Sequence, residues 1–489
     1  MGHGVPTPQG TDGRDQSAES GSGPQPQQTS ETQTGSTLNI GPLFVQTVRH
    51  FFPDLNDWID EIPDPRFLPF VTYDKKFLMW WGLSLFLFKL KSRRQLDFEL
   101  NTDGPEVLGN LNRLAGTTQD TRPVHNTLDY FLGCIGTEAV ASLRTQMVYR
   151  LIRMKALDDA RLQGRFVVAV DGSGYLVFNE KHCDNCLIHK HGDSTLYKHQ
   201  VLEGKLLGPA DTVISIATEF IDNRDVNATK AVGSEQQKQD CELKALRRLA
   251  AKMRQEFPQL PLCLSGDALF ACGEGFQIAK DYKLSYVYVF KPGRMPAVWE
   301  DFQSLLKMCS TQEVVIHTPD KETLVYRWVK MSYTDSDGRP WSFTAIQCEI
   351  NSAKGERSVW AWVTDLEVNR KTVVAVATKG GRHRWRIENQ GFNTQKTSDL
   401  NLEHVFSHGQ WAAYYYLLQI AHLILQLVEK GNLLRKLAEE CGKRTAVMLF
   451  GSLKNMAKRL LESLRYHIWP EDAYDRQKAG RIQIRLDSG

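Results

Sequence analysis

Three acidic residues have surroundings suited to phosphodiester chemistry. Asp171 closes the apolar run 166–170, and Asp267 follows the apolar run 262–266. Both aspartates are therefore predicted at the C-terminal ends of buried strands. Glu388 lies inside the arginine-rich run 381–390, GRHRWRIENQ, which is predicted to be helical. The order along the chain is strand-Asp, strand-Asp, helix-Glu.

Carboxylates from elements remote in sequence are what two-metal phosphodiester chemistry requires. Two ions about 3.5–4 Å apart clamp the attacking and leaving oxygens, and Mg²⁺ (or Mn²⁺) prefers hard carboxylate oxygens. On a helix, Arg384 lies one turn before Glu388 on the same face and can contact a phosphate beside the metal. The alternative interpretation is an ordinary Arg-Glu pair, with the two aspartates serving as turn residues or helix caps.

The elements that must position these acids change type along the chain. Residues 1–40 have a disordered composition, rich in Gly, Gln, Ser, Thr and Pro. Apolar residues at helical spacing predict an all-helical segment over 41–160. Strands follow at 166–171, near 197–207 and at 212–220, then a helix over 240–257 and the strand that delivers Asp267. This β-β-β-α-β order is that of a ribonuclease-H-like core.

The 120 residues between Asp267 and Glu388 are too many for a simple connection. Alternating runs at 324–330, 341–349 and 359–365 predict a mostly β insertion. The expected fold class is α/β, a mixed sheet with flanking helices. The expected domains are a helical segment 41–160 for DNA-end binding, a core of 161–284 plus 379–440, a β-rich insertion 285–378, and a C-terminal helix with a basic tail, 441–489.

The three acidic blocks carry a resemblance to a known family. Val-Asp-Gly-Ser-Gly at 170–174, Ser-Gly-Asp-Ala at 265–268 and the block from Arg384 through Glu388 to Asn393 resemble the catalytic blocks of insertion-sequence DDE transposases, in the group with a Tyr-Arg-Glu-Lys signature. The resemblance covers residues 171–427. It implies a ribonuclease-H-like fold, Mg²⁺ or Mn²⁺, binding to terminal inverted repeats and target DNA, and at least a homodimer on paired ends.

The signature is matched only in part. Arg384 and Glu388 agree with it, whereas Gly381 stands where the tyrosine is expected and Gln395 stands at the lysine position, followed by Lys396. Lys396 and Arg386 are the further candidates for phosphate contact. In this group the β insertion can place a tryptophan against a flipped base. The candidates here are Trp328, Trp360 and Trp362, each with core packing as the alternative role.

The implied activity is metal-dependent cleavage at transposon ends and strand transfer into target DNA. Two alternatives remain open: a nuclease of the same fold that does not join DNA, and an inactive, transposase-derived DNA-binding protein. A catalytic cysteine at Cys183 or Cys272 is much less favoured, because no Cys-His arrangement outside the cluster described next supports it.

A cysteine-histidine cluster lies between the first two predicted core strands. Its Cys-x-x-Cys pair with nearby histidines suits tetrahedral Zn²⁺. The candidate ligands are Cys183, Cys186, His191 and His199, with His189 or His182 as substitutes. The alternative is a polar hairpin with exposed histidines and reduced thiols.

Bulk composition limits the remaining possibilities. A net charge of +3 requires any DNA partner to be met by local basic clusters, such as 89–94 in the helical segment, our candidate for end recognition. Nine irregularly spaced cysteines and no recognisable signal peptide predict a cytoplasmic protein. The apolar stretches 77–90 and 411–428 are interpreted as core helices, so no membrane is expected.

Overall fold

The structure is a computed structural model that describes residues 38–192, 194–224, 227, 240–308, 312–470 and 484–486. The predicted disordered tail, 1–40, lies outside the described residues except for its last three. Most of the predicted basic tail, 471–483 and 487–489, lies outside them as well. From Asn39 onward the chain forms one unit.

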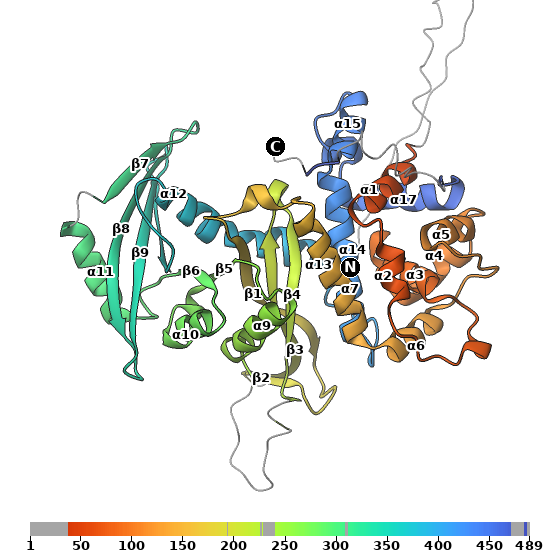
Figure 1. Cartoon of the computed structure of the whole chain (residues 1–489), viewed down its shortest axis with the longest axis horizontal. Coiled ribbons are helices and arrows are strands. Elements are labelled where there is room, and N and C mark those ends of the chain that lie inside the picture. Colours follow the sequence, from red (N-terminus) through yellow and green to blue (C-terminus); the bar gives the residue numbers. More distant parts are fainter. Residues whose placement is uncertain are drawn as a thin grey trace, which may run out of the picture. The chain divides into compact units, whose positions relative to one another are not determined.

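A mixed ten-stranded sheet runs through this unit (Figure 1). Its strands are β1 (Phe166–Phe178), β2 (Leu187–His191), β3 (Ser194–Leu207), β4 (Val213–Ile221), β5 (Leu262–Gly266), β6 (Ser285–Val289), β7 (Glu313–His317), β8 (Thr323–Thr334), β9 (Pro340–Asn351) and β10 (Arg357–Thr364). The order of neighbours is β2-β3-β1-β5-β6-β10-β9-β8-β7, with β4 also paired to β3. The pairs β1/β5 and β5/β6 are parallel, and the others are antiparallel. The predicted α/β class is confirmed at this level.

Strand β1 is longer than its apolar run. Residues 166–170 are fully buried, as expected for a strand covered on both faces. The strand then continues through the polar residues 171–174 to Phe178, because β3 pairs with it over this length. The prediction that Asp171 ends a strand is therefore wrong: it lies within β1. Asp267 directly follows β5, as predicted.

The predicted β insertion extends the same sheet. Strand β6, which the sequence assigned to the insertion, pairs in parallel with β5. Strand β10 then pairs antiparallel with β6, so that β8, β9 and β10, all predicted, continue outward from it. Helix α11 (Pro296–Met308), within the same stretch, was not predicted.

Helices form the remainder of the unit. Before the sheet come α1 (Gly41–Phe51), α2 (Leu55–Asp60), α3 (Lys75–Leu87), α4 (Arg93–Asn101), α5 (Val107–Ala115), α6 (His125–Ile135) and α7 (Thr137–Arg153), and three short helical turns, η1 (Leu68–Phe70), η2 (Asp158–Ala160) and η3 (Pro209–Asp211), also occur. Later helices are α9 (Glu242–Glu256), α10 (Gly273–Asp281), α14 (Trp411–Lys430), α15 (Asn432–Glu440), α16 (Ala446–Phe450) and α17 (Leu453–Tyr466). Helix α9 packs on β3 and β4.

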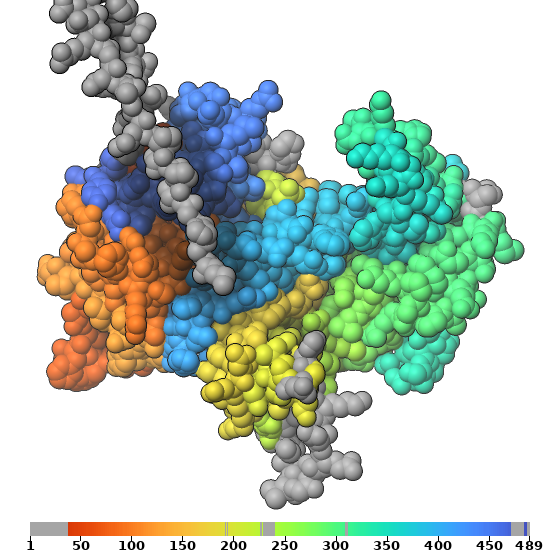
Figure 2. Space-filling model, turned by 180° about the vertical axis from the view of Figure 1, so that it is seen from behind, coloured from red at the N-terminus to blue at the C-terminus, as the bar shows by residue number. Residues whose placement is uncertain are grey.

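The N-terminal and C-terminal helices pack together. Helix α14 contacts α1, α3 and α7, and α17 contacts α1 and α5. The buried ring of Trp469, just after α17, lies against Phe44 of α1. Figure 2 shows the N-terminal helices in orange beside the C-terminal helices in dark blue. The C-terminal segment is therefore part of the helical layer that the sequence assigned to residues 41–160 alone.

Helix α14 is the one described helix long and apolar enough to cross a membrane, and 89% of that stretch is buried inside the protein. Its interpretation as a core helix is confirmed. Its buried Gln426 is bonded internally: the side chain accepts a hydrogen bond from the backbone amide of Val213 and donates one to the carbonyl of Val213.

The segment that carries Glu388 is helical but not a regular α-helix. It runs from α12 (Val373–Ala375) through the wide turns of η5 (Val376–Gly381), the tight turn of η6 (Arg382–Trp385) and the wide turns of η7 (Ile387–Asn393) to α13 (Thr394–Thr397). Changes of helical pitch of this kind are frequent at functional sites. Below, this stretch is called the 373–397 segment.

Two glycines let the 373–397 segment lie directly on the sheet. A side chain at Gly380 would meet Val287 of β6, and one at Gly381 would come within 2.5 Å of the buried indole of Trp362 on β10. Tyrosine, which the transposase signature places at this position, cannot occupy that space. Gly381 is therefore a packing requirement of this chain.

We predict that Gly381→Ala lowers the free energy of unfolding by about 1–3 kcal/mol, the usual cost of overpacking a core. The matched control is Gly109→Ala in α5, where the nearest neighbour is the flexible end of Arg113 at 3.1 Å. The control gains about 0.5–1 kcal/mol of helix propensity. Denaturant midpoints of the two variants measure the difference, and equal midpoints would contradict this account.

Candidate active site

The parallel pairing of β1 and β5 brings the two predicted aspartates to the same level of the sheet. Ala169 lies opposite Ser265 in the pairing register. Asp171 and Asp267 each come two residues later, on strands that are about 4.8 Å apart. Asp267 accepts a hydrogen bond from the amide of Leu269 at 2.8 Å and caps the short turn η4 (Ala268–Phe270). The alternative role, that of a helix cap, is thus confirmed for one carboxylate oxygen of Asp267.

Arg384 joins Asp171 to Glu388. Its guanidinium lies 3.2 Å from Asp171 Oδ2 and 3.0 Å from Glu388 Oε1. The side chains of Arg384, Asp171 and Glu388 are 10%, 21% and 34% exposed, so the group is buried at the arginine and open at the glutamate. The predicted common face of Arg384 and Glu388 is confirmed. Their ion pair is the one expected from the alternative interpretation, and Asp171 of β1 joins it.

The site packs more negative charge than its arginine balances. Burial raises the pKa of Asp171 to about 7, against the lowering effect of Arg384, and neighbouring Glu388 raises it further through charge and a shared hydrogen bond. A carboxyl group held in this state gains from a cation placed beside it. Arg384 Nε is buried without a hydrogen-bond partner among the described residues, so this guanidinium is incompletely satisfied.

A fourth carboxylate, Glu242, was missed by the sequence reasoning. It is the first residue of α9, and its Oε1 occupies the space that a side chain at Gly172 would need. Burial raises the pKa of Glu242, and the charge of Asp267 raises it further; Glu242 in turn raises the pKa of Asp171. The charge of Glu242 therefore interacts with the charges of both aspartates. The available signal was its place at the start of the helix predicted between the two aspartate strands.

The donor set suits a hard divalent cation. Asp171, Asp267, Glu388 and Glu242 offer only carboxylate oxygens, the ligands that Mg²⁺ and Mn²⁺ prefer. Within the described residues, the acids do not form a group whose ligand atoms all lie within 4.8 Å of one another. The four acids thus do not form a closed cage around a single ion. An open set of this kind, with part of its coordination left to substrate and water, is the arrangement typical of Mg²⁺ sites.

The other two residues predicted to contact phosphate pair with different acids. Arg386 pairs with Asp211 at 2.7 Å, and Lys396 pairs with Glu403 at 2.8 Å. Gln395, at the lysine position of the signature, is fully buried and bonded to Gln419 and His422. Position 395 thus faces the core, which leaves Arg384 as the predicted cation that lies among the acids.

The predicted base-stacking tryptophans are mostly core residues. Trp328 and Trp362 are 6% and 1% exposed, so neither presents a ring face for a base in this conformation. Trp360 is half-buried and meets Trp385 edge to face, with centroids 6.2 Å apart. Trp385, which directly follows Arg384 and was not singled out from the sequence, is 46% exposed.

Two cations of the basic cluster 89–94 pair with acidic residues, and a third is buried. Lys89 is buried, and burial lowers its pKa to about 8. Lys91 pairs with Asp399 at 3.3 Å and Arg93 with Asp129 at 3.2 Å. Recognition of DNA ends by this cluster stays a prediction.

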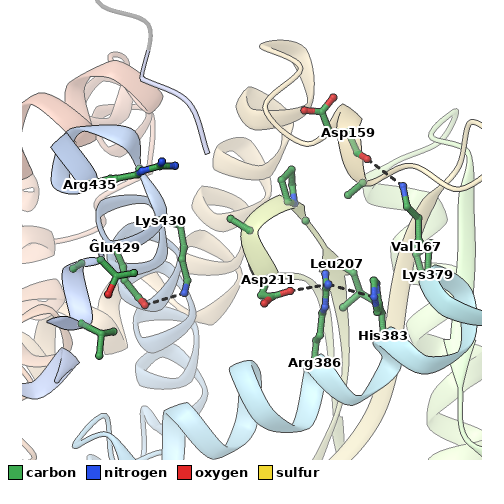
Figure 3. Close-up of a pocket in the computed structure, with 18 of the residues that line it drawn as sticks. Asp159, Val167, Leu207, Asp211, Lys379, His383, Arg386, Glu429, Lys430 and Arg435 are labelled. Atoms are coloured by element: carbon green, nitrogen blue, oxygen red, sulfur yellow. Dashed lines mark hydrogen bonds and ion pairs between the residues drawn. The ribbon is translucent and has the colours of Figure 1, made fainter. Parts of the chain in front are cut away.

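A pocket of about 740 Å³ lies near the start of β1 and the end of β3 (Figure 3). Its lining includes none of Asp171, Asp267, Glu388 or Glu242. Two cations on its wall form ion pairs: Arg386 with Asp211, and Lys430 with Glu429 at 3.0 Å. Burial and the neighbouring Arg386 lower the pKa of His383 in this wall to about 4, so it is neutral at physiological pH.

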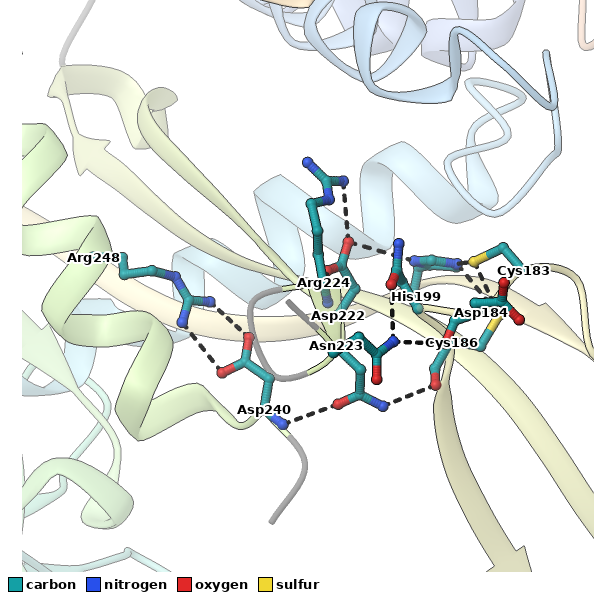
Figure 4. A network of polar contacts seen from close by, with 11 residues as sticks. Cys183, Asp184, Cys186, His199, Asp222, Asn223, Arg224, Asp240 and Arg248 are labelled. Carbon is teal, nitrogen blue, oxygen red and sulfur yellow. Dashed lines mark hydrogen bonds and ion pairs between the residues drawn. The ribbon is translucent and has the colours of Figure 1, made fainter. Parts of the chain in front are cut away.

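The predicted zinc ligands are brought together in part. Cys183, Cys186 and His199 are in mutual contact (Figure 4). His189, on β2, is exposed. His191 is the last residue of β2, and its side chain lies outside the described residues. His182, named only as a substitute, is the histidine grouped with Cys183 and His199.

Comparisons with known proteins do not identify the chain: no protein-family model matches it, and no curated protein matches it.

We predict that Arg384→Ala lowers the free energy of unfolding of the metal-free protein by about 2 kcal/mol, because two carboxylates lose a charged hydrogen-bond donor. Adding Asp171→Asn to this variant should recover part of the loss by removing one unbalanced charge. Urea unfolding in chelator, then in Mg²⁺, measures both effects.

The matched control is Arg327→Ala on β8, which breaks the more exposed pair with Glu313. Such surface pairs contribute about 0–1 kcal/mol. An Arg384→Ala variant no less stable than this control would show that the acids do not need the guanidinium.

We predict that Glu242→Gln stabilises the metal-free protein at pH 7 and weakens its response to Mg²⁺ or Mn²⁺. Because folding raises the pKa of Glu242, the ionised carboxylate opposes folding above that pKa, and the opposition disappears below about pH 4.3, where both states are protonated. Melting temperatures from pH 4 to 8 test the sign. A variant less stable than wild type at pH 7 would contradict it.

Proposed function

We propose that this chain is a DDE transposase that uses divalent metal to cut DNA at transposon ends and join the freed 3′ ends to target DNA. The observation that carries the proposal is the contact of Asp171 with Arg384 and Glu388, which are more than 200 residues away in the sequence. The acids and the arginine that meet here are the ones on which the family resemblance rests.

The sheet supports a ribonuclease-H-like core. Strands β1, β3 and β4 form an antiparallel ribbon in chain order, α9 packs on it, and β5 and β6 follow in parallel with β1. This is the β-β-β-α-β order expected for such a core, and the 373–397 segment brings the last acid to it. Strand β2 and the extension β7–β10 are additions to that arrangement.

The proposed roles are metal binding by the acids and orientation of the phosphate by Arg384. Mg²⁺ or Mn²⁺, when bound, would polarise the scissile phosphate and lower the pKa of an attacking water. Asp171, Asp267 and Glu388 are its proposed ligands, with Glu242 beside them. Arg384 can turn from its carboxylates to a phosphate oxygen, a contact that favours the in-line geometry by positioning and electrostatics.

The proposal includes partners and a compartment. Terminal inverted repeats and target DNA are the proposed substrates, with a homodimer assembled on paired ends. A cytoplasmic location is compatible with the cysteines of the described residues, all of which are free thiols.

We predict that Asp171→Ala, Asp267→Ala and Glu388→Gln each reduce Mg²⁺-dependent cleavage by at least about 10³-fold, since lost metal ligation removes several kcal/mol of transition-state stabilisation. DNA binding should persist. The substrate is a plasmid that carries the gene with its natural flanking DNA, assayed for nicks, excised ends and joined products.

The control for this series is Glu300→Gln, an exposed acid of α11 that should leave cleavage unchanged. Full cleavage by any of the three variants would refute the active-site assignment. Cleavage without joining of precut ends would favour the nuclease, and specific DNA binding without cleavage by wild type would favour an inactive derivative.

A further inference from the structure

The cysteine-histidine cluster has the dimensions of a tetrahedral metal site. Cys183 Sγ lies 3.6 Å from Cys186 Sγ, and His199 Nε2 lies 3.3 and 3.4 Å from the two sulfurs. Zn–S bonds of about 2.3 Å and Zn–N bonds of about 2.0–2.1 Å place tetrahedral ligand atoms about 3.3–3.8 Å apart. The three atoms are thus close to the separations that one zinc ion imposes.

The histidine at the centre of the cluster has an unused nitrogen directed at a carboxylate. His199 is 4% exposed, and its Nδ1 is buried without a hydrogen bond among the described residues. Asp222 Oδ2 lies 4.0 Å from that nitrogen. A carboxylate behind the second nitrogen is the usual support of a metal-bound imidazole, because it fixes the tautomer and raises the basicity of the ligand.

His182 is the best fourth ligand. It offers an atom within 4.8 Å of those of Cys183 and His199, in a group that does not include Cys186. Its Nε2 is hydrogen-bonded to His408 Nδ1 at 2.7 Å, whereas its Nδ1 is buried without a partner in the described part of the chain. One nitrogen is therefore oriented by a neighbour, as in His199, and the other is available to a metal.

The backbone around the cysteines is fixed by neighbouring elements. The side chain of Asn223, just after β4, donates a hydrogen bond to the carbonyl of Cys186 at 3.0 Å. The backbone amide of Asn223 donates another to the carbonyl of Asn185 at 2.8 Å. The backbone amide of Cys186 donates a hydrogen bond to the carbonyl of Cys183, which closes a tight turn. Figure 4 shows this network, with Cys183, Cys186 and His199 converging beside Asp222.

We propose that Cys183, Cys186, His199 and His182 hold one structural Zn²⁺ ion. Binding removes the two thiol protons to solvent and involves no change of oxidation state. The ion joins the β1–β2 connection to β3 and, through the His182 contact, to the residues just before α14. This ligand set replaces the sequence-based choice of His191, and it does not depend on the proposed DNA chemistry.

The test is elemental analysis of the untagged full-length chain, purified without chelator and without DNA. Wild type should carry about one zinc per chain, and Cys183→Ser, Cys186→Ser or His199→Ala should lose it. Cys441→Ser, an exposed cysteine, and His189→Ala, an exposed histidine of β2, are the matched controls that should retain it. Asp222→Asn should weaken zinc binding about 10–100-fold.

Two further measurements keep the result decisive if the ligand variants fail to fold. Replacing zinc by Co²⁺ in wild type should give the visible spectrum of a tetrahedral thiolate complex, and alkylation of Cys183 and Cys186 should require prior chelation. Zinc-free wild type, or a Cys183–Cys186 disulfide in freshly purified protein, would overturn the proposal. Loss of zinc from His191→Ala with retention in His182→Ala would overturn the ligand set.

Discussion

Like-charged carboxylates that share a half-buried site are stabilised by a cation packed with them. Asp171 and Glu388 meet on one guanidinium, and Glu242 and Asp267 add negative charge behind them. Removing one partner of such a buried group leaves uncompensated charge, which usually costs far more than the pair contributes. Arg384 thus supplies the positive charge that the protein itself places between these carboxylates, while burial and the charge of Glu388 keep the pKa of Asp171 raised.

The placement of this arginine depends on contacts between the 373–397 segment and the sheet. Ser265 of β5 donates to the carbonyl of Gly380, and the glycines at 380 and 381 lie against Val287 and Trp362. These contacts fix the segment over the parallel strands β5 and β6. From there a tight turn directs Arg384 toward β1. Sheet register sets the level of the two aspartates, and glycine packing sets the approach of the glutamate.

The sequence was informative where a residue's neighbours in the chain determine its environment. The apolar runs predicted β1, β5 and α9, and the spacing of Arg384 and Glu388 predicted that they share one face of a helical segment. The extension of β1 beyond Asp171 was missed because its polar residues 171–174 are held by pairing with β3, a partner remote in sequence. Glu242 was missed because an acid in a first helical turn is ordinarily explained by the helix dipole. Chain spacing alone did not reveal that His182 lies with Cys183 and His199.

The two candidate metal sites lie on one β-ribbon and are distinguished by their ligand chemistry. Asp171 pairs with Glu203, and Leu176 pairs with His199, so about 13 Å of strand separates the levels of the two sites. Carboxylate oxygens alone suit Mg²⁺ or Mn²⁺, whereas two thiolates and imidazoles select the softer Zn²⁺. A zinc ion held by Cys183 and Cys186 would therefore not compete with a hard ion at Asp171. It would hold the far end of the ribbon in place while the acids at the other level exchange their cation.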